Sequence, residues 1–187
     1  MIRVQREDFD PGAEIERLIA GQTGIGGVVS FTGLVRDLTG DLAGMTLEHY
    51  PGMTEAKLAE IEAEAGRRWP LAASLIIHRV GPLKPGDRIV LVVAASPHRD
   101  AAFEACRFLI DWLKTKAPFW KSEQTAAGER WVAQRASDDA AAARWDPAAD
   151  DPAENTAGRT EPAPGRTGPA PDRSKPAMGW EKTAARD

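Results

Sequence analysis

Cysteine is scarce in this 187-residue chain, which has only Cys106. A single cysteine excludes an intrachain disulfide and a zinc site built from several thiolates of one chain, and it is typical of proteins in a reducing compartment. Long apolar runs are also missing: none approaches the ~20 residues that a membrane span requires. The N-terminus, MIRVQREDFD, lacks the apolar stretch of a signal peptide. We therefore predict a soluble, cytoplasmic protein.

Positive charge is not in excess, because 24 Lys and Arg face 28 Asp and Glu, a formal net charge of −4. This balance excludes a nucleic-acid binder that is held by bulk charge, since phosphate neutralisation needs an excess of cations. His49, His78 and His98 show no metal-ligand spacing, and P-loop, GxGxxG and GxSxG motifs are absent. We expect no metal, no nucleotide cofactor and no serine triad.

The C-terminal segment 146–187 differs in composition from the rest. Seven of the 14 prolines lie in it, and its only large apolar side chains are Met178 and Trp180. Such a segment buries too little surface to offset the entropy lost on ordering. We predict one domain over 1–145 and a disordered tail over 146–187. The predicted domain has 18 basic and 20 acidic residues, so any cationic site in it must be local.

Hydrophobic periodicity predicts strands and helices in the order β-α-β-β-α-β-β-α-β-β. The expected strands cover 2–5, 26–32, 45–50, 74–80, 88–95, 119–125 and 130–134. We expect 26–32 and 45–50 to form a hairpin-like pair. The run IVLVVAA within 88–95 does not alternate, which favours a central strand covered on both faces. Helices mixed with consecutive strands indicate an α+β fold with a largely antiparallel sheet.

Three helices are expected, each from its N-terminal signals. Asp10 and Pro11 are typical of the N-cap and first position, Thr54 is the expected cap of the second helix, and Ser96 followed by Pro97 opens the third. The predicted buried stripe of the third helix consists of Phe103, Cys106, Ile110 and Leu113. We therefore interpret Cys106 as a small core residue and not as a nucleophile.

The two ends of the third helix carry candidate functional cations. His98 and Arg99 lie in the first turn, where positive charge opposes the helix dipole and free backbone N–H groups favour an anion. A phosphate or carboxylate site is one interpretation, and two solvated side chains are the other. Lys114, in the last turn, is expected on dipole grounds alone. Lys121 follows two aromatics, where partial desolvation would suit acid–base work, but an exposed edge-strand lysine has the same pattern.

Two arginines each follow a predicted strand. Arg36 lies in FTGLVRD shortly after Gly33, and Arg135 comes at the end of the last strand. A backbone bend at glycine is able to aim a side chain into a cleft, although a surface charge has the same pattern.

Taken together, the motifs of this chain resemble one family, the large, catalytic subunit of molybdopterin synthase. The matching stretches are FTGLVRD (31–37), LEHYPGMTE (47–55), RWPL (68–71), IHRVG (77–81), PGD (85–87), SPHRDAAFEA (96–105), LKTKAPFWK (113–121) and ERWV (129–132). They run in family order over about residues 26 to 145. LEHYPGMTE and LKTKAPFWK together are specific to this family.

The resemblance implies an α/β-hammerhead-type fold and a homodimer that becomes a heterotetramer with two small sulfur-carrier subunits. The carrier's C-terminal Gly-Gly thiocarboxylate would give sulfur to cyclic pyranopterin monophosphate (precursor Z), forming the dithiolene of molybdopterin. It implies catalytic roles for Lys114 and Lys121. It also implies anion binding by Arg36, His98, Arg99 and, from the neighbouring protomer, Arg135, which we expect to gather around one pocket.

Two other functions fit parts of the pattern. A partner-binding module without turnover would need a groove but no lysine for proton transfer, so Lys114 and Lys121 count against it. A small phosphate-binding hydrolase with His98 as its base would need a nucleophile or metal ligands, and the sequence offers neither set.

Overall fold

The computed structural model describes residues 1–132 and 136–146, and their strands form two four-stranded sheets. In the first sheet the order is β1 (Ile2–Gln5), β4 (Ala73–Arg79), β6 (Arg88–Ser96) and β2 (Gly27–Leu34). In the second it is β5 (Gly81–Leu83), β3 (Leu42–His49), β7 (Phe119–Thr125) and β8 (Gly128–Val132). Only the β1–β4 pair of these sheets is parallel. The predicted α+β class with largely antiparallel pairing is confirmed.

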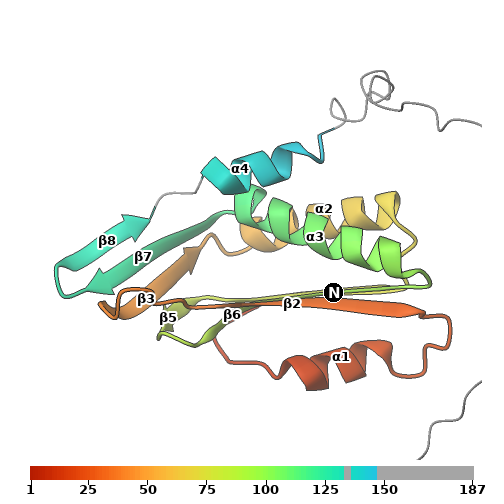
Figure 1. The fold of residues 1–187 in the computed structure, drawn as a ribbon, viewed down its shortest axis with the longest axis horizontal. Helices are drawn as coiled ribbons and strands as arrows, with labels where there is room; N and C mark the ends of the chain where they lie inside the picture. Colours follow the sequence, from red (N-terminus) through yellow and green to blue (C-terminus); the bar gives the residue numbers. More distant parts are fainter. Residues whose placement is uncertain (133–135, 147–187) are drawn as a thin grey trace, which may run out of the picture. The chain divides into compact units, whose positions relative to one another are not determined.

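Helices cover both faces of the first sheet (Figure 1). One face carries α2 (Met53–Arg68) and α3 (Arg99–Lys116), and the other carries α1 (Pro11–Ile19). Strand β6 alternates between two core clusters: Val92 packs in the cluster with α2 and α3, and Val93 packs in the cluster with α1. The prediction of a central strand covered on both faces is therefore correct. A further helix, α4 (Ala136–Ala143), packs against α3.

The expected pairing of the second and third strands is wrong. β2 pairs with β6, whereas β3 pairs with β5 and β7 in the other sheet. The connection changes sheets at Val35, whose N–H donates to the carbonyl of Asp87 at 2.8 Å. The Asp37 carboxylate then accepts the N–H groups of Thr39 and Gly40 at 3.2 and 2.9 Å and turns the chain. The apolar β6 offers a better buried partner than the neighbouring strand in sequence.

Asp10 caps α1 as predicted, with its carboxylate accepting the Ala13 N–H at 2.9 Å, but the other two predicted caps need correction. The N-cap of α2 is Gly52 and not Thr54, whose buried hydroxyl accepts the Tyr50 N–H at 3.2 Å. The N-cap of α3 is His98 and not Ser96. The Ser96 hydroxyl donates to the Pro70 carbonyl at 2.9 Å and accepts the His98 N–H at 3.2 Å. The Thr54 hydroxyl therefore links the start of α2 to the preceding Tyr50, and the Ser96 hydroxyl links the start of α3 to the distant Pro70.

The predicted buried stripe of α3 is wrong at Phe103, which is 61% exposed. The buried residues of this helix are Ala102, Ala105, Cys106, Phe108, Leu109 and Leu113. In the parts of the chain that the structure describes, no helix is both long enough and apolar enough to cross a membrane. The predicted tail over 146–187 lies, apart from Asp146, outside the described residues.

Candidate functional site

Lys114 lies in the last turn of α3 and faces α4. Its Nζ is 3.6 Å from Oδ1 of Asp138, in the first turn of α4, and about half of the Lys114 side chain (49%) is exposed. The lysine is therefore partnered by a carboxylate and at the same time open to an incoming ligand. Lys114 was a candidate from the sequence, whereas Asp138 was not.

Lys121 lies in β7, between Leu47 of β3 and Val132 of β8 in register. Its Nζ is 3.5 Å from Oε1 of Glu123, and only 33% of its side chain is exposed. Burial opposes the ionisation of Glu123, but the guanidinium of Arg130 and the Lys121 ammonium outweigh it, so the pKa of Glu123 is lowered. Lys121 thus occupies a half-buried position beside an ionised carboxylate.

The connection between α3 and β7 separates the two lysines and is held on both sides. The Thr54 hydroxyl donates to the carbonyl of Pro118 at 3.3 Å. The ring of Phe119 stacks on His78, with 3.7 Å between ring centroids. His78 is buried in β4, and burial lowers the pKa of its imidazole to about 4. Neither support was predicted from the sequence, although the apolar run before His78 (SLII) was a signal that this histidine is buried.

The structure places His98 and Arg99 at the opposite end of α3 from Lys114. Lys114 lies fifteen positions after Arg99 on this helix, which at 1.5 Å per residue is about 22 Å. Arg99 is exposed, and its Nε is 3.4 Å from Oδ1 of the neighbouring Asp100. One chain therefore does not bring His98 and Arg99 to the two lysines.

Arg36 is also distant from Arg99. Gly27, at the start of β2, lies against the backbone of Arg99, because a Cβ atom on this glycine would be 3.3 Å from the Arg99 Cα. Arg36 follows the other end of β2, beside the Lys84–Asp87 turn, and is exposed. The seven-residue advance from Gly27 to Leu34 spans about 23 Å in an extended strand. Arg135, the remaining predicted site residue, lies outside the described residues.

A largely apolar hollow of about 290 Å³ runs along α3 and the outer strand β2. It is lined by Val29, Ser30, Phe31, Phe103, Cys106, Arg107, Ile110 and Asp111. Ile110 and Lys114 are four residues apart and share one face of α3, so Lys114 lies one turn beyond the hollow. Phe103, which periodicity assigned to the buried stripe of α3, lines this hollow and stays exposed.

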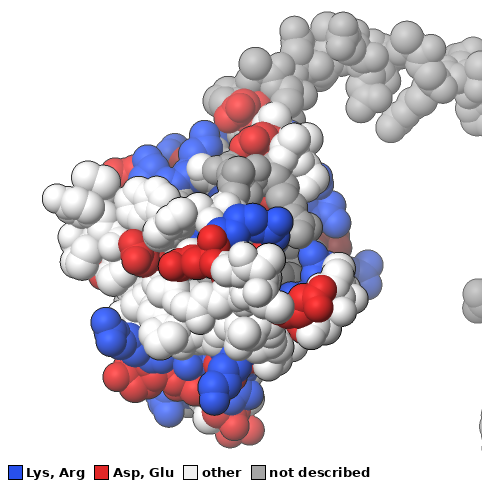
Figure 2. All heavy atoms as spheres, turned by 90° about the vertical axis from the view of Figure 1, so that its left-hand side faces the viewer, with Lys and Arg blue, Asp and Glu red and all other residues white. Residues whose placement is uncertain are grey.

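Positive and negative side chains are mixed on the face of the molecule that Figure 2 draws. Figure 2 shows Lys and Arg side chains interspersed with Asp and Glu side chains on this face, without a continuous patch of one sign. The ion pairs of Lys121 with Glu123 and of Lys114 with Asp138 follow the same pattern. Local pairing, and not a general positive surface, surrounds the candidate lysines.

Comparison with known proteins gives consistent matches. A family model described as MoaE protein matches residues 4–116. A Pseudomonas aeruginosa protein named molybdopterin synthase catalytic subunit is 58% identical over 147 residues, covering 78% of this chain and 98% of that protein. The solved structure of a molybdopterin biosynthesis MoaE protein from Burkholderia ambifaria is 55% identical, with a TM-score of 0.68, and the match covers 78% of this chain and 97% of that one.

A more distant solved structure shares the fold alone. It is a Helicobacter pylori chain, 20% identical with a TM-score of 0.61, covering 72% of this chain and 91% of that one. That structure is a protein–protein complex of subunits 1 and 2 of molybdopterin-converting factor. The family model covers more than half of the chain, and the Pseudomonas relative matches over almost its full length. This chain therefore belongs to the MoaE protein family.

Proposed function

We propose that this chain is the catalytic subunit of a molybdopterin synthase. It transfers sulfur from the C-terminal thiocarboxylate of a small carrier protein to cyclic pyranopterin monophosphate, forming the dithiolene of molybdopterin. The observation that carries this proposal is the match to a catalytic subunit along 98% of its length, together with two lysines at the ends of one fixed connection.

The hollow beside α3 suits the extended tail of the carrier. Phe31, Phe103 and Ile110 offer apolar contact. The outer edge of β2, which pairs with no other strand among the described residues, offers backbone groups to a strand-like peptide. A tail that runs toward the C-terminus of α3 would bring its terminal thiocarboxylate to Lys114, whose ammonium is partly exposed. Lys114 would then hold the anionic terminus by a charge-assisted hydrogen bond.

Lys121 is suited to proton transfer while the pterin side chain takes up sulfur. Its half-buried position limits water, and the ionised Glu123 at 3.5 Å holds the Lys121 ammonium in place as a proton donor to the reacting groups. Because Phe119 is stacked on His78, the start of β7 is fixed before substrate binds. Such fixed geometry is what acid–base catalysis requires.

A second copy of the chain would complete the anion site. Within one chain, about 22 Å separates Arg99 from Lys114, which is too far for both to contact one small substrate. In a homodimer, His98 and Arg99 of one protomer would bind the phosphate near the lysines of the other, and Arg135 would reach across in the same way. Two carriers on such a dimer give a heterotetramer. The H. pylori chain with this fold was likewise solved with another subunit.

The direct test is dithiolene formation by purified protein supplied with thiocarboxylated carrier and precursor Z. We expect Lys114→Ala and Lys121→Ala each to lower the rate by at least ~100-fold. Lys116→Ala is the matched control, since Lys116 lies in the same last turn of α3 but over the Trp112 ring at 4.7 Å. No product from the unaltered protein with an authenticated cognate carrier would favour a binding module without turnover.

The shared site has its own test by mixing two inactive variants. Arg99→Ala and Lys121→Ala damage different halves of the proposed site. If the halves come from different protomers, co-expression restores one intact site in each mixed dimer, and activity returns in part. If each protomer builds its own site, the mixture stays as inactive as its components.

A further inference from the structure

Trp145, two residues after the end of α4, anchors this helix on α3. The indole Nε1 donates to Oδ2 of Asp111 at 2.8 Å, and the Trp145 carbonyl accepts from Nη1 of Arg68 at 2.9 Å. The indole also makes edge contacts with Trp69 and Phe108, at centroid distances of 5.7 and 5.6 Å. These contacts reach α2 and α3, so they fix one end of α4 against both helices.

The N-terminal end of α4 places Asp138 beside Lys114. Asp138 lies in the first turn, where the helix dipole favours a carboxylate, and its side chain is only 26% exposed. Ala142, one turn later, is buried against the body of the protein. The anchored helix therefore holds one acidic group 3.6 Å from the lysine ammonium.

We propose that Asp138 is a positioning residue for Lys114, and that α4 with its Trp145 anchor serves to place this carboxylate. The inference rests on the proposed function of Lys114. A partly exposed ion pair contributes only ~0.2–1 kcal/mol to stability. Its main effect is to limit the directions that a long, flexible side chain takes at the end of the hollow.

The other charged groups near Lys114 leave this role to Asp138. Asp111, one turn earlier on α3, accepts the Trp145 indole and lies 3.8 Å from Nε of Arg144. Lys116 lies over the Trp112 ring. Asp139, the other acidic residue of the first turn of α4, has a contact of its own. Asp138 is the carboxylate that the described part of the chain pairs with Lys114.

Steady-state assays of Asp138→Asn test the positioning role. We expect kcat to fall about fivefold, the equivalent of ~1 kcal/mol, with an unchanged KM for precursor Z. Asp138→Glu restores most of the loss, because it keeps the charge. Glu16→Gln removes one carboxylate from α1, on the opposite face of the sheet, and leaves kcat unchanged. Unchanged or increased activity in Asp138→Asn overturns the proposal.

A double-mutant cycle separates positioning from general damage. In the Lys114→Ala background, Asp138→Asn should cost nothing further, because the residue that it positions is gone. An equal further loss in that background contradicts the proposal. Trp145→Phe, which removes the Asp111 hydrogen bond but keeps an aromatic ring, is expected to lower kcat in the same direction as Asp138→Asn.

Chemical labelling tests the same contact without relying on turnover. Lys114 of Asp138→Asn should react faster with an amine-acylating reagent at pH 7 than Lys114 of the unaltered protein, as measured by peptide mass spectrometry, with Lys116 as internal reference. Faster labelling in a protein that makes no dithiolene would refute the proposed function and keep the Asp138–Lys114 contact. Equal labelling would refute the contact itself.

Discussion

His78 of β4 and Phe119 of β7 stack face to face, with ring centroids 3.7 Å apart and planes 15° apart. The contact joins a strand of the first sheet to a strand of the second, two residues before Lys121. A buried imidazole in such a stack must stay neutral, because charging it without water is costly. The stack thus joins the two sheets at the start of β7, and it contains an imidazole, that of His78, which is neutral in the folded protein.

Acid should weaken the fold through His78. Burial lowers the pKa of its imidazole from 6.5 to about 4, so the unfolded chain binds the proton more readily than the native protein. The contribution is complete above about pH 6.5 and is lost as pH falls toward 4, by about 3 kcal/mol over the full range. Urea unfolding at pH 7 and pH 4.5 should show this loss, and His78→Phe should reduce the difference between the two.

His98→Gln is the matched control for this experiment, because His98 is exposed at the start of α3. We expect it to leave the pH dependence of unfolding unchanged. If His78→Phe and the unaltered protein lose the same free energy between pH 7 and pH 4.5, His78 is not the acid-sensitive group.

The sequence predicted the elements of the fold better than their pairing. The apolar IVLVVAA run correctly indicated the central strand β6. The pairing of β2 with β6 depends on a partner more than fifty residues away, and local periodicity carries no information on such a partner. Helix α4 was missed because its alanine-rich segment has almost no apolar stripe, and its position depends on the anchor at Trp145.

The site residues stay a prediction from the sequence, and their arrangement could not be derived from it. Motif resemblance identified Lys114 and Lys121, and their places at the ends of one connection agree with a shared task. The predicted third helix opens at Ser96 and its stripe continues to Leu113, which already separates Arg99 from Lys114, yet the family resemblance implied one pocket. Asp138 and the His78 stack are tertiary contacts, which spacing in the sequence does not encode.

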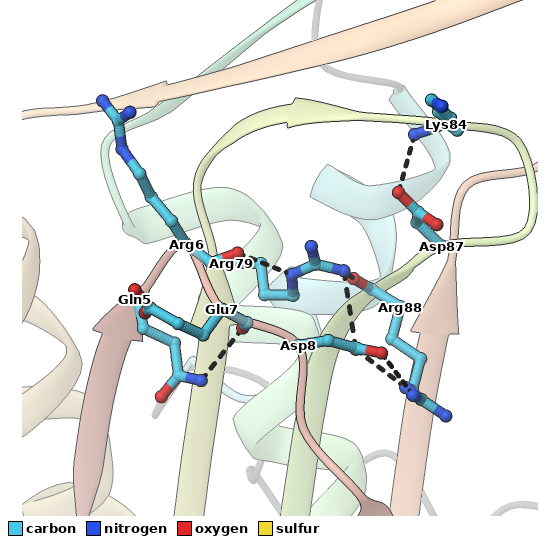
Figure 3. A network of polar contacts seen from close by, with 8 residues as sticks. All are labelled: Gln5, Arg6, Glu7, Asp8, Arg79, Lys84, Asp87 and Arg88. Atoms are coloured by element: carbon cyan, nitrogen blue, oxygen red, sulfur yellow. Dashed lines mark hydrogen bonds and ion pairs between the residues drawn. The ribbon is translucent and has the colours of Figure 1, made fainter.

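The ion pair between Asp8 and Arg88 is a second acid-sensitive contact, in a lower pH range. Arg88 donates from Nε to Oδ1 of Asp8 at 2.9 Å, and Arg79 lies nearby in the same network (Figure 3). The hydrogen bond from Arg88 lowers the pKa of Asp8 from 3.8 to about 2. Its contribution is therefore present above about pH 3.8 and is lost as pH falls toward 2.

Asp8→Asn should cost less than ~1 kcal/mol at pH 7, because both side chains are partly exposed and solvent screens the pair. The cost should shrink in 1 M NaCl, as measured by urea unfolding at low and high salt. Glu16→Gln should show no comparable salt effect. A loss for Asp8→Asn that does not depend on salt would mean that packing, and not charge, links this segment to the sheet.

Cys106 should be chemically inert in the folded protein. Burial raises the pKa of its thiol to about 11, so roughly a thousandth of it is thiolate at pH 8. Iodoacetamide should label the native protein far more slowly than the urea-unfolded chain. Cys106→Ala should keep sulfur transfer at a cost of ~1 kcal/mol in stability. Loss of product formation by a folded Cys106→Ala protein would contradict a mechanism in which sulfur comes only from the carrier.

Gly26 allows the close approach of the chain to the start of α3. Its N–H donates to the Ser96 carbonyl at 3.0 Å, and a Cβ atom would stand 2.2 Å from the carbonyl oxygen of Pro97. Since this neighbour is backbone, Gly26→Ala must displace the segment that carries His98 and Arg99. We expect a loss of ~1–3 kcal/mol in the free energy of unfolding and a higher KM for precursor Z.

Gly24→Ala separates this clash from the general effect of replacing a glycine. A Cβ atom on Gly24 meets nothing within 4 Å, while the entropy that alanine removes from the unfolded chain is the same at both positions. Gly24→Ala should therefore be neutral or stabilising by up to ~1 kcal/mol. The difference between the free energies of unfolding of the two variants, measured in urea, is the cost of the contact with Pro97. Equal free energies would show that the start of α3 moves without loss of stability.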